Sequence, residues 1–139
     1  MDARRYELAT LAAVRKLRSS YCSLAHGKVL AERFFDPATV RELALDHGAA
    51  GLGATEVAIM DLAERVAGDA SSITDDDIQR LRDVGLGDRE IFDVVAAAAA
   101  RCFFSKTVDA LGGLPDAVYA DLEPGLREAL TVGRPIERG

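Results

Sequence analysis

Residues 6–28 read YELATLAAVRKLRSSYCSLAHGK, and this stretch predicts two helices with a very short connection between them. Apolar residues recur through residues 4–18 without glycine or proline, so this segment is expected to form the first helix. The pair Ser19–Ser20 interrupts the pattern and is expected to cap a second helix over residues 21–34. Two helices joined so closely fold as an antiparallel hairpin or a kinked pair.

The same stretch carries the side chains best suited to chemistry. Cys22 and His26 are four residues apart, so a helix places them on one face. Ser19 is expected to cap that helix and to place the Cys22 thiol in its first turn, where the helix dipole favours the thiolate. Glu7, one helix earlier, can fold back and orient the imidazole. A thiol, a base and an orienting carboxylate are the parts of an activated nucleophile.

The remaining chain is also helical in pattern, and no alternating strand-like segment is present. The fold is therefore expected to be an all-α bundle of six to seven helices, with one domain over residues 1–132 and a flexible tail at 133–139. Asp36, Thr74 and Asp88 are the expected caps of three helices. The alanine run 96–100 permits close helix approach, so the long helix is expected to be the centre of the bundle. The expected later helices cover residues 37–45, 55–66, 75–84, 88–111 and 117–130, the last of them broken at Pro124.

Composition narrows the classes of function. The 139 residues carry a net charge of −6, which argues against nucleic acid as a partner. No apolar run reaches the roughly 18–20 residues that cross a bilayer, so no membrane is expected as a partner. The first residues do not resemble a secretory signal, and a cytoplasmic location is expected. The charge is uneven, because residues 1–33 have a net charge of +4 and the remainder has −10.

Neither a disulfide framework nor a metal site is expected. The two cysteines, Cys22 and Cys102, are separated by most of the chain. Together with His26 and His47 they are the only soft metal ligands, and their spacing matches no metal motif. A lone cysteine on a helix is usually a small buried hydrophobic residue, so the spacing to His26 is the evidence for chemistry.

The pattern Glu7-x11-Ser19-x2-Cys22-x3-His26 resembles the active-site motif of the alkylhydroperoxidase D-like family, which includes the carboxymuconolactone decarboxylases. In that family the motif reads Glu-x11-Cys-x2-Cys-x3-His. The later stretches 74–91 (TDDDIQRLRDVGLGDREI) and 108–112 (VDALG) are similar to its peroxidase-related branch, and the resemblance extends over residues 4–122.

This resemblance implies a helical domain that assembles as a homotrimer or hexamer and acts as an antioxidant peroxidase. By position, Cys22 would attack the hydroperoxide, His26 would act as general base, Glu7 would orient it, and Tyr21 would donate a hydrogen bond nearby. Because Ser19 replaces the resolving cysteine, no internal disulfide can form. The expected activity is a one-cysteine, thiol-dependent hydroperoxide reductase that uses an external thiol and no other cofactor.

Two alternatives stay open. In a carboxymuconolactone decarboxylase-like lyase, His26 would transfer protons, and Arg15, Arg18 or Arg101 would hold substrate carboxylates. In a non-catalytic helical oligomer with a binding or sensing role, the loss of the cysteine at position 19 would mark a decayed redox site. Cys102 would resolve Cys22 only within about 7 Å between α-carbons, and packing inside its helix is the expectation for it.

Overall fold

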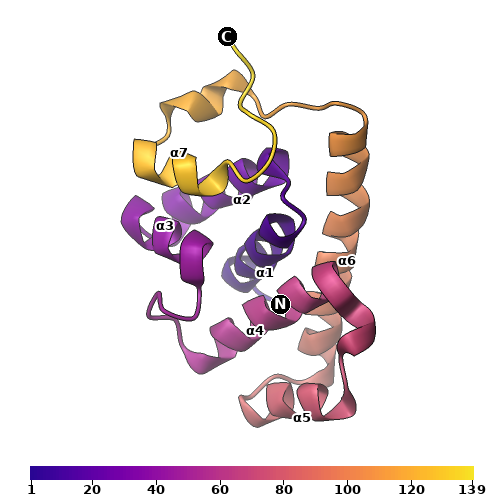
Figure 1. Ribbon diagram of the computed structural model, residues 1–139. Helices are drawn as coiled ribbons and strands as arrows, with labels where there is room; N and C mark the ends of the chain where they lie inside the picture. The colour runs from indigo at the N-terminus through magenta and orange to yellow at the C-terminus, as the bar shows by residue number, and fades with distance from the viewer.

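The computed structural model describes every residue from Met1 to Gly139, and the chain is built of helices without strands (Figure 1). The expected all-α fold of six to seven helices is confirmed, because seven α-helices and two short 3-10 helices form. None of the helices combines the length and apolar character that a membrane crossing requires. The elements are α1 (Ala3–Lys16), α2 (Ser20–Arg33), α3 (Pro37–Asp46), α4 (Ala54–Asp69), η1 (Ala70–Ser72), α5 (Asp75–Asp83), α6 (Asp88–Ala110), η2 (Ala117–Asp121) and α7 (Pro124–Leu130).

The centre of the bundle is α1. Seven consecutive residues of this helix, Leu8 to Val14, are buried, and α1 packs against α2, α4 and α6. The expectation that the alanine-rich long helix would be central is wrong. Only Ile91, Val94, Ala98 and Ser105 of α6 are buried, so α6 packs with one face and exposes the other along the side of the molecule (Figure 1).

Short-range hydrogen bonds determine where the helices start. Two of the three N-caps expected for the later helices are confirmed, and the third is wrong. The Asp36 carboxylate accepts the Thr39 backbone N–H at 2.9 Å and caps α3. Thr74 and Asp77 form the reciprocal capping box at the start of α5. Asp88 is not a cap, because Gly87 occupies the N-cap position of α6 and Asp88 is already helical. An acidic residue in that first turn still suits the helix dipole.

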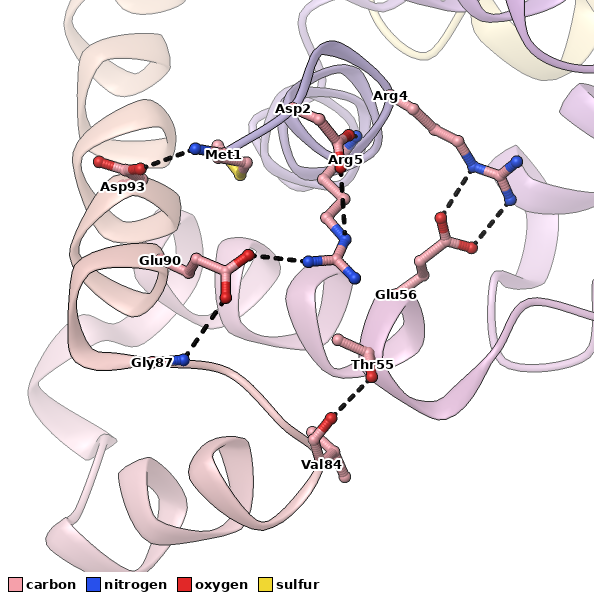
Figure 2. A network of polar contacts seen from close by, with 10 residues as sticks. All are labelled: Met1, Asp2, Arg4, Arg5, Thr55, Glu56, Val84, Gly87, Glu90 and Asp93. Atoms are coloured by element: carbon pink, nitrogen blue, oxygen red, sulfur yellow. Dashed lines mark hydrogen bonds and ion pairs between the residues drawn. The ribbon is translucent and has the colours of Figure 1, made fainter.

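Ion pairs hold the first turns of α1 against its neighbours, as Figure 2 shows. The Arg4 guanidinium makes a two-point contact with Glu56 of α4, at 2.8 and 3.0 Å. Arg5 donates to Glu90 of α6 at 2.8 Å. Because these contacts connect α1 to both α4 and α6, they also set the position of Glu7, which follows within the next turn.

The C-terminal helix α7 lies over α2 and α3 (Figure 1). Gly27 permits the close approach of α2 to α7, since a Cβ at this position would clash with the Leu130 side chain. Beyond α7, the Gly133 backbone N–H donates to Ser20 Oγ at 2.7 Å. The division into a domain at 1–132 and a flexible tail at 133–139 stays a prediction.

Candidate active site

The structure brings Glu7 of α1 and His26 of α2 into direct contact. Glu7 Oε2 lies 2.7 Å from His26 Nδ1, and the two side chains are only 13% and 17% exposed. Tyr6 presents its ring edge-on to the imidazole at 6.4 Å between centroids. The carboxylate therefore fixes one nitrogen of the ring and the orientation of the whole imidazole.

The other ring nitrogen of His26 faces a cation on α6. Arg101 Nη1 lies 3.3 Å from His26 Nε2. A guanidinium can only donate, so Nε2 accepts this hydrogen bond and the single ring proton sits on Nδ1, donated to Glu7. In this neutral tautomer Nε2 carries the lone pair that a general base uses, and Arg101 covers it.

Cys22 lies in the first turn of α2, as expected, but it is 2% exposed. Its Sγ accepts a hydrogen bond from Ser105 Oγ of α6 at 3.1 Å. No hydrogen bond joins Cys22 directly to His26, whose two nitrogens are occupied by Glu7 and Arg101. The site is therefore assembled from three helices and closed by α6.

Ser19 occupies the N-cap position of α2, yet the expected capping hydrogen bond is absent. Its side chain is fully buried, and its hydroxyl has no hydrogen-bond partner. The backbone carbonyl of Ser19 does accept the Ser23 N–H at 2.9 Å, so the helix begins here without help from the side chain. The buried hydroxyl therefore contributes nothing to the capping of α2.

The sequence matches no protein-family model and no curated protein. The structure, in contrast, is similar to an uncharacterized peroxidase-related protein from Silicibacter sp. TM1040, with a TM-score of 0.81 and 22% identity. It is also similar to the alkylhydroperoxidase AhpD core of an uncharacterized peroxidase-related protein from Ralstonia eutropha JMP134, with a TM-score of 0.79 and 21% identity. The fold is that of alkylhydroperoxidase D-like proteins. Each match covers 86% of this chain, and the chain spans 63% of the length of each of these two proteins.

Within this alkylhydroperoxidase D-like fold, two of the other candidate residues, Tyr21 and Cys102, make no hydrogen bond to Glu7, Cys22 or His26. Tyr21 is 36% exposed and packs against Phe104. Cys102 is partly buried, and both cysteines are free thiols.

The other candidate cations and ligands are separated from the His26 site or scattered. Of the three arginines considered for substrate carboxylates, only Arg101 contacts His26, whereas Arg15 and Arg18 line a separate cavity. No group of three or more His, Cys, Asp or Glu side chains is placed to hold a metal ion.

Sequence reasoning did not assign Ser105 to the site or pair Arg101 with His26. Both belong to a stripe along α6 in which Val94, Ala98, Arg101 and Ser105 follow at intervals of three and four residues. This spacing marks the inward face of an amphipathic helix. The inward face of α6 is apolar except for an arginine and a serine at its end. These two polar residues could have indicated from the sequence that α6 faces a polar site.

Proposed function

We propose that this protein is a thiol-dependent hydroperoxide reductase of the one-cysteine type, with Cys22 as the attacking residue. The observation that carries the proposal is the 2.7 Å contact between Glu7 and His26, one helical turn from a first-turn cysteine. This contact leaves Nε2 of the imidazole as the basic nitrogen. Ser105 adds a donor that can hold the sulfur and stabilise negative charge on it.

In the proposed cycle the Cys22 thiolate attacks one peroxide oxygen of a small hydroperoxide. A sulfur–oxygen bond forms, the oxygen–oxygen bond breaks, and the leaving alkoxide takes up the proton that His26 removed from the thiol. Cys22 is thereby oxidised to a sulfenic acid and the hydroperoxide is reduced to an alcohol.

Recovery of the thiol requires an external reductant, because Ser19 cannot resolve the sulfenic acid. One external thiol condenses with it, releasing water and forming a mixed disulfide with Cys22. A second external thiol attacks this disulfide, regenerating Cys22 and leaving as the external disulfide. The balance is one hydroperoxide and two thiols consumed, with one alcohol, one water and one disulfide formed. We propose that this takes place in the cytoplasm, where thiols are kept reduced.

The proposal requires that the site opens. Cys22 is 2% exposed, and Arg101 occupies the nitrogen that must take the thiol proton. Arg101, which contacts His26, and Ser105, which contacts Cys22, lie one turn apart on α6. A displacement of this part of α6 would release the His26 nitrogen and uncover the sulfur together.

The test is oxidation of the protein by hydrogen peroxide and by an organic hydroperoxide, followed by intact mass. Cys102→Ser is the matched background, because it leaves Cys22 as the only thiol. The expected result is a gain of one oxygen atom that an external thiol removes and that Cys22→Ser abolishes. Ser19→Cys in the same background is expected to lose two hydrogen atoms instead, as an internal disulfide with Cys22 forms. A Cys22 that stays unmodified would refute the peroxidase and favour the non-catalytic helical oligomer.

The contact between Arg101 and His26 supports a second candidate, a carboxymuconolactone decarboxylase-like lyase. A guanidinium beside a neutral imidazole is suited to hold a substrate carboxylate where His26 can transfer a proton. Conversion of γ-carboxymuconolactone that survives Cys22→Ser and is lost in His26→Ala would select this reaction. Loss of conversion in both variants, or no conversion at all, would exclude a lyase in which the cysteine is incidental.

We also propose that the protein forms a homotrimer or hexamer through the outer face of α6. Phe92 and Phe103 lie on one face of α6 and are 69% and 78% exposed, and Leu111, directly after the helix, is 83% exposed. A second copy of the chain is the occupant that the resemblance implies. Light scattering after gel filtration is expected to give an oligomer for the wild type and a monomer for Phe103→Glu. A monomeric wild type at all concentrations would refute the interface.

A further inference from the structure

A cavity with a volume of about 370 Å³ lies at the C-terminal end of α1. None of its lining residues belongs to the Glu7, Cys22 and His26 site. Its apolar side is formed by Ala12 of α1, Leu43 of α3 and Met60 of α4, each at most 5% exposed. The volume falls in the lower part of the range that small-molecule sites occupy.

The polar lining of this cavity is cationic. Arg15, Lys16 and Arg18 contribute three positive charges, and Glu64 is the one carboxylate among the lining residues. The local balance is thus positive in a protein whose net charge is −6. Charges of one sign in a concave surface with apolar walls focus the potential and attract ions of the opposite sign.

Two of the lining groups are held in place by contacts made outside the cavity. Arg15 Nη1 donates to the Ala129 carbonyl oxygen of α7. His47 Nε2 lies 2.6 Å from Asp61 Oδ1, and the imidazole is only 16% exposed. Such anchoring reduces the entropy lost when a ligand binds.

The charge of Arg15 is only partly compensated within the protein. Burial lowers the pKa of the Arg15 guanidinium from its ordinary value, and the Glu64 carboxylate acts in the opposite direction. A partly buried cation with one acidic neighbour gains from a further anion in the same cavity.

Arg18 has an unusual backbone conformation for its residue type. It adopts a left-handed backbone conformation with φ of 56°, the one non-glycine residue in the chain to do so. The Arg18 N–H donates to Arg15 O and the Ser19 N–H to Val14 O, each at 3.0 Å. These two bonds form a Schellman motif, in which glycine is the usual residue at this position.

Glycine would satisfy this backbone at lower cost, yet the chain has an arginine here, and this arginine is one of the residues that line the cavity. Balance of the helix dipole does not require it, because Arg15 and Lys16 already lie in the last turn of α1. A residue held in an unfavourable backbone conformation is an indication of function when its side chain is what the site uses.

We propose that this cavity binds a small metabolite carrying at least two anionic groups, phosphate or carboxylate, through Arg15, Lys16 and Arg18. The apolar wall would contact the carbon skeleton or bridging part of the ligand. This proposal does not depend on the peroxidase activity, since the two sets of residues are separate.

The test is calorimetric titration of the full-length protein with pyrophosphate and with citrate, at an ionic strength kept constant with sodium chloride. Arg18→Gly is the decisive variant, because glycine suits the left-handed position and the fold is expected to persist. Arg89→Ala is the matched control, since Arg89 is exposed at the start of α6, away from the cavity.

Saturable binding of at least one of the two anions is expected for the wild type and for Arg89→Ala. Arg18→Gly should weaken it about tenfold or more, the ordinary effect of losing one charge-assisted hydrogen bond. Tighter binding of pyrophosphate would identify phosphate as the preferred group, and tighter binding of citrate would identify carboxylate. Equal affinity in Arg18→Gly, or no saturable binding of either anion, would overturn the proposal.

Discussion

Replacement of Ser19 by alanine tests the most unusual feature of the site, a serine at a helix N-cap that does not cap. At an ordinary N-cap this substitution costs about 0.5–2 kcal/mol of stability. Here the hydroxyl makes no capping bond, is fully buried and has no partner. A buried polar group without a hydrogen bond is unfavourable by about 1–3 kcal/mol.

Removal of the Ser19 hydroxyl therefore eliminates a penalty and leaves a space of only one atom. We expect the free energy of unfolding of Ser19→Ala to be unchanged or raised by up to about 1 kcal/mol. The measurement is urea denaturation at neutral pH, followed by helical circular dichroism. Thr74→Ala is the matched control, because Thr74 caps α5 through a capping box. It is expected to lose about 1 kcal/mol, or about 3–5 °C in Tm.

A loss of about 1 kcal/mol or more in Ser19→Ala, equal to that of Thr74→Ala, would refute this reasoning. It would mean that the Ser19 hydroxyl makes a stabilising hydrogen bond in solution. The result also bears on chemistry. If Ser19 has no structural role, then any new redox behaviour of Ser19→Cys reports on the pairing with Cys22 and not on a damaged helix.

Three further predictions concern packing, charge and backbone. Gly27→Ala is expected to destabilise by about 1–3 kcal/mol in urea denaturation, because its Cβ would meet the fully buried Leu130; an unchanged midpoint would contradict the tight contact. The hydrogen bond from the Thr74 N–H lowers the pKa of the Asp77 carboxyl from its ordinary 3.8 to about 2. The stability that Asp77 contributes is present above pH 4 and is lost as the pH falls to 2. The Tm difference between the wild type and Asp77→Asn should accordingly shrink as the pH falls from 4 towards 2 and vanish only below pH 2, and a constant difference would argue against the shift. Arg18→Gly is expected to gain about 0.5–1 kcal/mol by relieving the left-handed arginine, and a loss would show that its side chain stabilises the fold.

The sequence predicted the helices and most of their ends because short-range signals determine them. Asp36 followed by proline, and Thr74 followed by three aspartates, act within one turn, and the structure has both caps. Asp88 was misplaced by one position, because a glycine before an acidic first turn also accommodates the N-cap. Such differences are small since each depends on neighbours in the chain.

The choice of the central helix could not be predicted in the same way. The alanine run of α6 allows close packing, but alanine side chains contribute little apolar area. The larger leucines of α1, Leu8 and Leu11, contribute more, and both are fully buried. The helix with the larger apolar side chains is therefore the more deeply buried one. A run of small residues indicates close packing but does not indicate which helix is central.

In the candidate site, too, some contacts could be predicted from the sequence and others could not. The contact of Glu7 with His26 followed from two adjacent helices with a short connection, so the sequence limited its geometry closely. Arg101 and Ser105 are 75 and 83 residues from their partners, and only the packing of α6 brings them there. Long-range contacts of this kind depend on how three helices meet, and one sequence without the fold does not specify that.

Helix α6 takes part in both the proposed redox site and the proposed subunit interface. Its inward face closes the site, with Arg101 on the His26 nitrogen and Ser105 on the Cys22 sulfur. Its outer face exposes Phe103. At the border of that face, the Phe104 ring packs against Tyr21, and its centroid lies 5.4 Å from the guanidinium carbon of Arg101. In the proposed mechanism this part of α6 is displaced when Cys22 reacts, so a partner subunit on the outer face would pack against the helix that moves. Oligomer formation and access to the thiol are in this arrangement two properties of one helix, and a change to either face is expected to alter both.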